Sequence, residues 1–111
     1  MWILPKKHLA DFTRLGDQDI PELAAILKEC LCRLRSLLDD PPYNLVLHTA
    51  PYRHHKKDVY WKTVEKDTHW YLQIMPRLTL NAGFEWGTGI HINPTPPEEA
   101  ASLLRDVVVS A

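Results

Sequence analysis

The residues whose types and spacing could carry chemistry lie in one short stretch of alternating polar and apolar side chains. His69, Tyr71 and Gln73 occupy every second position. Successive side chains of a β-strand point to opposite faces, so these three share one face at intervals of roughly 7 Å. Such a row can align imidazoles on a phosphate or a metal ion, and His48, at the end of another predicted strand, is expected beside it. On spacing alone, the solvent-exposed face of an antiparallel sheet is the favoured alternative.

A second candidate is the glycine-rich segment 83–93, in which glycines flank Phe84 and Trp86. Glycines let a backbone approach a ligand closely, and aromatic rings can stack on that ligand. The glycine order is not that of a dinucleotide-binding loop, and the P-loop lysine is absent. Taken alone, the segment is better interpreted as a tight turn with buried aromatic residues.

Other reactive residues give weaker signals. The basic run 53–57 is typical of a solvated loop, and His54 and His55 lack the partners and spacing of a zinc site. Cys30 and Cys32 are two positions apart on a predicted helix, about 200° apart around its axis, so no disulfide is expected between them. The expected location is therefore the reducing cytoplasm.

The composition bounds the function. The 111 residues are 45% hydrophobic and 24% charged, and 13 basic against 14 acidic residues give a net charge of −1. These values indicate one globular domain spanning 1–111 and exclude global disorder. A nucleic-acid or membrane-surface binder needs a basic excess, which the chain lacks. No apolar run approaches the roughly 20 residues of a transmembrane helix, and no signal-peptide pattern opens the chain.

These residues must be positioned by a sheet and two helices. Apolar residues recur every three or four positions from Asp17 to Leu38, which predicts one long amphipathic helix ended by two prolines. Thr95 is the predicted N-cap of a short C-terminal helix, with Glu98 completing a capping box. Strands are predicted at 2–5, 43–49 (buried), 68–75 and 90–93, with a short edge segment at 59–64. The fold class is α+β: an antiparallel sheet, one long helix packed on it and a short C-terminal helix.

Four segments, in this order, resemble the C-terminal half of galactose-1-phosphate uridylyltransferases and their sugar-nucleotide phosphorylase relatives. They are Trp-Ile-Leu-Pro-Lys-Lys-His at 2–8, Leu-His-Thr-Ala-Pro at 47–51, His-Trp-Tyr-Leu-Gln-Ile-Met-Pro-Arg-Leu at 69–78 and Gly-Phe-Glu-Trp-Gly-Thr-Gly-Ile-His-Ile-Asn-Pro at 83–94. The resemblance covers nearly the whole chain. It implies the HIT-like α+β fold of the histidine-triad superfamily.

The resemblance implies that covalent chemistry resides elsewhere. Full-length relatives have two such domains, and the N-terminal one carries a His-Pro-His nucleophile that attacks the α-phosphorus of a nucleotide sugar. This chain contains no His-Pro-His, so no catalytic residue is assigned. In single-domain relatives, the nucleophile stands where this chain has Tyr71, with His69 and Gln73 as minor candidates beside it. A tyrosinate nucleophile needs a large fall in pKa, for which the sequence shows no cause.

The resemblance also implies a metal site and a sugar-phosphate site. Some relatives hold a structural metal through a histidine before Ala-Pro and a His-x-His pair; His48 and His69 match the first two positions, and Tyr71 replaces the third. A neutral phenol is a poor metal ligand, so this site is degraded, and neither zinc nor iron is expected as a cofactor. The loop of relatives that reaches the sugar 1-phosphate matches Phe84, Trp86, Gly87, Thr88, Gly89 and Asn93.

The expected function is therefore that of a sugar-phosphate- or nucleotide-sugar-binding domain of a nucleotidyltransferase in galactose metabolism, with a separate N-terminal half-enzyme as its partner. One alternative is a non-catalytic nucleotide-binding HIT-like module. A less favoured one is an independent HIT-type hydrolase that uses His69 as a general acid–base. Because a strand begins directly at Met1, an upstream part is expected to be missing. A free copy is then expected to cover the open sheet edge by forming a homodimer.

Overall fold

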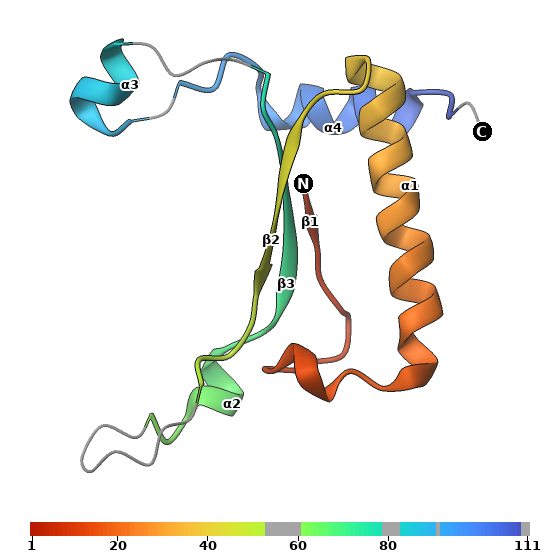
Figure 1. The fold of residues 1–111 in the computed structure, drawn as a ribbon, viewed down its shortest axis with the longest axis vertical. Coiled ribbons are helices and arrows are strands. Elements are labelled where there is room, and N and C mark those ends of the chain that lie inside the picture. The colour runs from red at the N-terminus through yellow and green to blue at the C-terminus, as the bar shows by residue number, and fades with distance from the viewer. Residues whose placement is uncertain (53–60, 79–82, 91, 110–111) are drawn as a thin grey trace. The chain divides into compact units, whose positions relative to one another are not determined.

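The computed structural model describes residues 1–52, 61–78, 83–90 and 92–109. Its elements are β1 (Trp2–Ile3), two short 3-10 helices (Phe12–Arg14 and Asp17–Asp19), α1 (Ile20–Leu38), β2 (Tyr43–His48), α2 (Val64–Asp67), β3 (Tyr71–Pro76), α3 (Gly83–Thr88) and α4 (Pro97–Asp106), as Figure 1 shows. The predicted α+β class, with an antiparallel sheet, one long helix and a short C-terminal helix, is confirmed.

The described strands form one sheet in the order β1-β3-β2. β1 runs antiparallel to β3, with Trp2 opposite Gln73 and Ile3 opposite Leu72. Along β3 the side chains of Leu72 and Ile74 are buried, whereas Tyr71 and Gln73 are half-buried. This confirms the predicted alternation, which follows from the two-residue period of a strand.

β2 was expected to be a buried strand, and this prediction is wrong. Leu45 is 45% exposed and Leu47 is 40% exposed. The reason is position: β2 lies at the edge of the described sheet, so its side chains have a neighbouring strand on one side only.

The short edge strand predicted at 59–64 is also wrong for the part that the structure describes, since Val64 begins α2. Residues 59 and 60 lie outside the described residues. The local cause is a carboxylate: Asp67 accepts hydrogen bonds from the Trp61 indole (2.6 Å) and from the Thr63 hydroxyl. These bonds close the chain into a helical turn rather than an extended strand.

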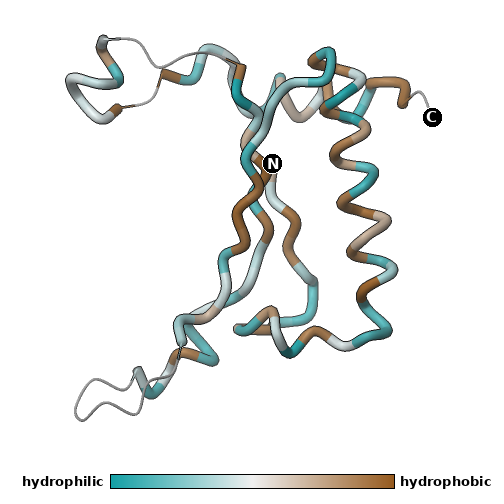
Figure 2. The backbone as a smooth tube through the Cα atoms, in the orientation of Figure 1, coloured by the Kyte–Doolittle hydropathy of each residue, from teal (hydrophilic) through white to brown (hydrophobic). Residues whose placement is uncertain are grey.

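α1 begins at Ile20 after a 3-10 turn at Asp17–Asp19, so the helix predicted from Asp17 is confirmed except for its first turn. Figure 2 shows hydrophobic and hydrophilic residues alternating along it. After α1, Asp39 and Asp40 adopt φ values of 56° and 55°. Aspartate tolerates this left-handed conformation better than most residues, and the following prolines prevent the helix from continuing.

Segment 83–93 differs most from its prediction. The expected loop is the short helix α3, and residues 90, 92 and 93 form no strand; residue 91 lies outside the described residues. α3 ends at Thr88, and the next residue, Gly89, has a φ of +70°, a conformation that favours glycine just after a helix.

The predicted capping box of α4 is wrong as well. The N-cap is Pro96 rather than Thr95, and no side chain caps this end of the helix. Two consecutive prolines explain the difference. Pro96 is extended at ψ 140° and Pro97 takes the first helical position, so Thr95 lies one residue too early to cap.

By its internal contacts the chain divides into two compact units, Met1–Leu27 with Asn44–Met75, and Lys28–Tyr43 with Pro76–Ala111. In the first unit, Trp70 and Ile74 are the largest fully buried side chains of the described residues. In the second, Arg33 of α1 donates hydrogen bonds to the carbonyl oxygens of Leu104 (2.8 Å) and Arg105 (2.9 Å) at the end of α4. Among the described helices, none has the length and apolarity to cross a membrane.

Candidate functional site

Three of the predicted site residues meet on one face of the sheet in the first unit. The His48 ring of β2 stacks on the Tyr71 ring of β3, with centroids 4.2 Å apart and planes at 11°. The His48 Nε2 atom lies 2.9 Å from the Gln73 side-chain oxygen. On the opposite side of Tyr71, Trp2 of β1 stacks at 4.8 Å. The result is an aromatic row, Trp2–Tyr71–His48, that crosses all three strands.

Trp2 is the member of this row that sequence reasoning missed. The sequence did indicate that Trp2 and Tyr71 both lie on strands, at 2–5 and 68–75. Strand alternation gives the face that each side chain takes within its own strand. It does not give the order of the strands, and only the order β1-β3-β2 puts Tyr71 between the other two rings.

His69 does not join this row. It precedes β3, and its Nδ1 atom accepts the Leu9 backbone N–H at 3.1 Å, while its Nε2 atom lies 2.9 Å from the Pro5 carbonyl oxygen. An acceptor at Nδ1 and a donor at Nε2 are the two roles of one neutral imidazole tautomer. His69 also stacks on His8, with ring centroids 5.0 Å apart. Both ring nitrogens of His69 are thus engaged with the N-terminal segment of the chain.

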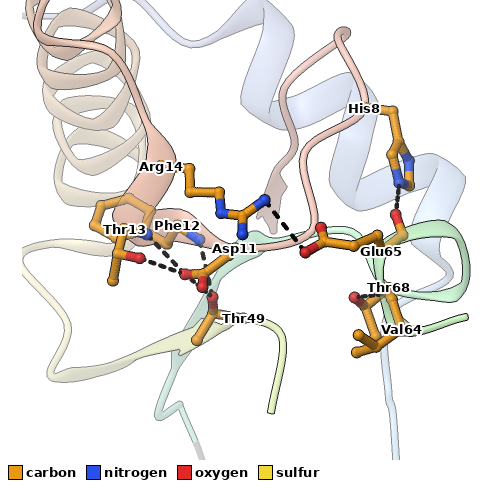
Figure 3. A network of polar contacts seen from close by, with 9 residues as sticks. All are labelled: His8, Asp11, Phe12, Thr13, Arg14, Thr49, Val64, Glu65 and Thr68. Atoms are coloured by element: carbon orange, nitrogen blue, oxygen red, sulfur yellow. Dashed lines mark hydrogen bonds and ion pairs between the residues drawn. The ribbon is translucent and has the colours of Figure 1, made fainter. Parts of the chain in front are cut away.

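The N-terminal segment whose Leu9 N–H bonds to His69 is itself fixed by polar contacts. Figure 3 shows this network. Asp11 accepts hydrogen bonds from the backbone N–H and the hydroxyl of Thr13, at 2.9 and 2.8 Å. The Phe12 N–H donates to the Thr49 hydroxyl at 2.9 Å. Arg14 and Glu65 form an ion pair at 3.2 Å. These contacts connect residues 11–14 to Thr49, directly after β2, and to Glu65 of α2.

No group of three or more histidine, cysteine or acidic side chains is arranged to hold a metal ion within the described ranges. Of the two residues that match metal positions in relatives, His48 is paired with Gln73 and His69 with backbone groups. The third position of the pattern, Tyr71, is stacked between two rings. The chemistry that this face offers is aromatic stacking and hydrogen bonding from an amide–imidazole pair.

The other predicted site residues form a second group, in α3 and the residues after it. Phe84 is 53% exposed and Trp86 is 79% exposed. Their expected burial in a tight turn is therefore wrong. A six-residue helix that buries none of its side chains leaves both rings free to stack on a ligand.

The polar atoms of these residues form hydrogen bonds with neighbours in the same stretch of chain. The Thr88 hydroxyl donates to the Phe84 carbonyl oxygen at 2.7 Å, and the Gly89 N–H donates to the Glu85 carbonyl oxygen at 2.9 Å. The Asn93 side-chain oxygen accepts the Thr95 N–H at 3.4 Å. Adding a Cβ to Gly87 would meet no atom within 4 Å, so this glycine faces open space. Within the described ranges, the exposed rings of Phe84 and Trp86 have no partner to give up before they contact a ligand.

The first unit also contains a cavity of about 500 Å³ that the sequence did not reveal. Ile3, Leu9, Leu23 and Ile26 contribute to its apolar wall, and Trp70 is part of the same lining. The indole N–H of Trp70 is buried and has no hydrogen-bond acceptor in the part of the chain that the structure describes. The N-terminal segment from Ile3, the first half of α1 and Trp70 therefore leave a space between them that their side chains do not fill.

Comparison with known proteins gives a consistent set of relatives. The chain is 40% identical over 107 residues to an ADP-glucose phosphorylase from Arabidopsis thaliana, covering 96% of the chain and 29% of that relative. It is 29% identical over 114 residues to a galactose-1-phosphate uridylyltransferase from Thermotoga maritima, covering 96% of the chain and 34% of the relative. No protein-family profile matches the chain.

Solved structures agree. The crystal structure of an ADP-glucose phosphorylase from Arabidopsis thaliana with bound ADP-glucose matches with a TM-score of 0.85 and 40% identity, covering 96% of this chain and 33% of the other. A uridylyltransferase structure matches with a TM-score of 0.74 and 30% identity, over 94% and 32% of the two chains. The chain thus spans about a third of the length of the proteins it matches. It belongs, as a C-terminal-type HIT-like domain, to the galactose-1-phosphate uridylyltransferase family.

Proposed function

We propose that this chain is the sugar-phosphate- or nucleotide-sugar-binding domain of a nucleotidyltransferase, and that it works with a separate polypeptide that supplies the nucleophile. The observation that carries the proposal is the match to a structure solved with ADP-glucose, at 40% identity over 96% of this chain but only 33% of the other. The chain has no His-Pro-His sequence. Binding without the covalent step is the function left to such a domain.

The exposed rings of α3 are the proposed contacts for the hexose. Sugar rings present C–H faces that pack on aromatic side chains, and Trp86 offers the most exposed ring of the segment. Gly87, Gly89 and Asn93 complete the proposed site. Thr88 contributes through its hydroxyl, which exchanges the Phe84 carbonyl for a phosphate oxygen when the ligand binds.

Calorimetry with glucose 1-phosphate, galactose 1-phosphate and ADP-glucose tests this assignment. Trp86→Ala is expected to weaken binding about fivefold or more, because a well-placed ring contact contributes roughly 1 kcal/mol. Trp61→Ala is the matched control, since Trp61 is 50% exposed and lies outside the proposed site. His48→Ala tests the sheet face. Binding that survives Trp86→Ala but is lost in His48→Ala contradicts the assignment to α3.

The proposal includes no tightly bound metal. A zinc ion at the His48–His69 position would have to displace the Gln73, Leu9 and Pro5 contacts of these two rings. Metal analysis of protein purified without chelator is expected to give well under one equivalent of zinc or iron. One equivalent of metal that disappears in His48→Ala would contradict this part of the proposal.

A second candidate, a non-catalytic nucleotide-binding module, is favoured by the aromatic row on the sheet. Tyr71 occupies the position of a nucleophile in single-domain relatives and is stacked between Trp2 and His48. A planar base can extend this stack on the outer face of Trp2, which is 58% exposed. Binding of ADP that requires Trp2 but not Trp86 would support this candidate. Against an independent hydrolase stands His69, whose ring nitrogens both have backbone partners.

We also propose that the chain functions in the cytoplasm, in galactose metabolism, and that a free copy forms a homodimer. Cys30 and Cys32 are both free thiols. Burial raises the pKa of the Cys30 thiol, which keeps it protonated and unreactive at neutral pH.

Sedimentation at micromolar concentration tests the homodimer, and a purely monomeric chain would contradict it.

A further inference from the structure

The cavity in the first unit lies apart from both groups of predicted site residues. In the described part of the chain, its lining comes from residues 3–26 and from Trp70, so neither the aromatic row on the sheet nor the rings of α3 belong to it. Its volume of about 500 Å³ is within the range of about 300–1,000 Å³ that is typical of small-molecule sites. The proposed sugar-phosphate contacts leave this cavity without an assigned ligand.

The inner part of the cavity is apolar and firmly held. Ile3 and Trp70 are buried, at 7% and 2% exposure, and Leu9 and Leu23 are half-buried. The Trp70 backbone N–H donates to the Leu9 carbonyl oxygen at 3.0 Å, which joins the two sides of the wall. Burying a polar group without a hydrogen bond is costly. A ligand is therefore expected to place an apolar group in this inner part.

The rim of the cavity carries charges of both signs. Lys6 and Lys7 come from the N-terminal segment, and Asp19 and Glu22 come from the start of α1 and the turn before it. All four residues are exposed, which puts them on the solvent side of the cavity. Arg14, also part of the lining, forms an ion pair of 3.2 Å with a glutamate of α2 (Figure 3). The rim thus offers two ammonium groups and two carboxylates to a ligand.

We propose that this cavity binds a free α-amino acid with a large apolar side chain, such as phenylalanine. The side chain occupies the inner part beside Trp70. The ligand carboxylate lies at Lys6 and Lys7, and its ammonium group lies at Asp19 and Glu22. A ligand with a single charge is attracted by one pair of rim residues and repelled by the other, whereas a zwitterion places each charge near its opposite.

NMR titration with L-phenylalanine tests the site. The chain has four tryptophans, Trp2, Trp61, Trp70 and Trp86, and therefore four indole N–H signals. Of these four residues, Trp70 alone is part of the lining. Its signal, identified by its loss in Trp70→Phe, should shift and saturate at millimolar ligand. A saturable shift of another indole signal with none at Trp70 overturns the proposal.

Three analogues with the same aromatic ring test the two charges of the ligand. 3-Phenylpropanoate keeps only the carboxylate, 2-phenylethylamine keeps only the ammonium group, and N-acetylphenylalaninamide keeps neither. Each should bind about threefold or more weakly than L-phenylalanine, because each loses at least one exposed ion pair. Equal affinity of N-acetylphenylalaninamide and L-phenylalanine overturns the amino acid as the ligand.

Matched variants of α1 test the wall. Ile26→Asp adds a carboxylate to the lining and should weaken L-phenylalanine binding about tenfold or more. Ile20→Asp is the control and should bind as the parent does, since Ile20 is 50% exposed on the same helix but outside the lining. Ile26 is itself 42% exposed, so both variants should fold, which circular dichroism verifies. Equal binding by the two variants contradicts the cavity as the site.

Variants of the rim assign each charge to its partner. The double variant Lys6→Gln, Lys7→Gln should weaken binding of L-phenylalanine and 3-phenylpropanoate about threefold and should not weaken binding of 2-phenylethylamine. Glu22→Gln should weaken L-phenylalanine and 2-phenylethylamine and spare 3-phenylpropanoate. The reverse pattern overturns the proposed orientation of the ligand.

A competition measurement separates this inference from the proposed function. Glucose 1-phosphate should shift the Trp86 signal and leave Trp70 unchanged, and L-phenylalanine should do the opposite. A Trp70 shift with L-phenylalanine in a chain that does not bind glucose 1-phosphate supports the cavity site and contradicts only the proposed function. If glucose 1-phosphate displaces L-phenylalanine, the cavity belongs to the sugar-phosphate site and the inference is wrong.

Discussion

His69 shows how backbone partners can settle the role of a reactive side chain. Its imidazole accepts one backbone N–H and lies against one backbone carbonyl, so both nitrogens are engaged in joining β3 to the N-terminal segment. A histidine with these two partners stabilises the fold, because its ring links two segments that are distant in the sequence. Two residues further along, the Tyr71 ring is stacked between Trp2 and His48.

Trp70, between these two residues, is expected to dominate the stability of the first unit. It is 2% exposed and meets Phe12 edge-on at 5.1 Å. Trp70→Ala should lower the free energy of unfolding by about 3–5 kcal/mol, as measured by urea denaturation. Trp70→Phe should cost markedly less, because it fills much of the space and removes the unpaired buried N–H. Trp86→Ala, at a 79% exposed ring, is the control and should change stability by less than about 0.5 kcal/mol.

Asp67 gives stability a specific pH dependence. Hydrogen bonds from Thr63 and then Trp61 hold the pKa of its carboxyl below the ordinary value of 3.8. A carboxyl whose pKa is lower in the folded state contributes stability above its unfolded pKa, and this contribution is lost as the pH falls through the folded pKa. The stability difference between the parent and Asp67→Asn should therefore be constant near neutral pH and shrink below about pH 4.

In the NMR titration of the Asp67 carboxyl, Thr63→Ala should raise the pKa toward its ordinary value. An unchanged pKa in Thr63→Ala would mean that the hydroxyl does not stabilise the carboxylate.

At the scale of elements, the ends of helices decide where chain segments turn. The 3-10 helix at Phe12–Arg14 has a side-chain cap, in which Asp11 accepts the Thr13 N–H. α4 has none, because proline occupies its N-cap. A hydroxyl or carboxylate stabilises a helix start only from the N-cap position itself, where it can reach the free N–H groups of the first turn.

This difference is measurable in two alanine variants. Asp11→Ala should lower the free energy of unfolding by about 1 kcal/mol, since it removes a true cap. Thr95→Ala should change it by less than about 0.5 kcal/mol, although the sequence marks Thr95 as the stronger capping signal. Thermal unfolding followed by circular dichroism compares them. A larger loss in Thr95→Ala than in Asp11→Ala would place the start of α4 one residue earlier.

At the scale of the whole molecule, the chain corresponds to about a third of each protein that it matches. Several of its large apolar side chains are exposed, among them Trp2, Leu45 and Leu47 of the sheet. Specific ligand contacts are proposed above for the exposed rings of α3.

The missing nucleophile leads to a prediction for the isolated chain. Incubated with UDP-glucose or ADP-glucose, it should form no covalent nucleotidyl adduct detectable by intact-mass spectrometry, because no His-Pro-His is present. An adduct on this chain would contradict both non-catalytic proposals. If it mapped to Tyr71 and vanished in Tyr71→Phe, this tyrosine would be the nucleophile.

The sequence by itself determined the helix α1, the strand β3 and the family. Each of these depends on local periodicity or on long contiguous motifs: the three-to-four spacing of α1, the two-residue alternation around Leu72 and Ile74, and the segments at 69–78 and 83–94. Such signals survive in one dimension because neighbouring residues generate them. Segment 83–88, whose glycines suggested a loop, forms a helix that the same local signals did not predict.

Only the tertiary structure decided which of the predicted site residues meet. The row at 69, 71 and 73 shares a face in any strand, yet His69 turns to Pro5 and Leu9, while Tyr71 takes Trp2 and His48 as neighbours. Strand order and edge position fix those partners, as they fix the exposure of Leu45 and Leu47. Both are properties of contacts between residues distant in sequence, and alternation within one strand carries no information about them.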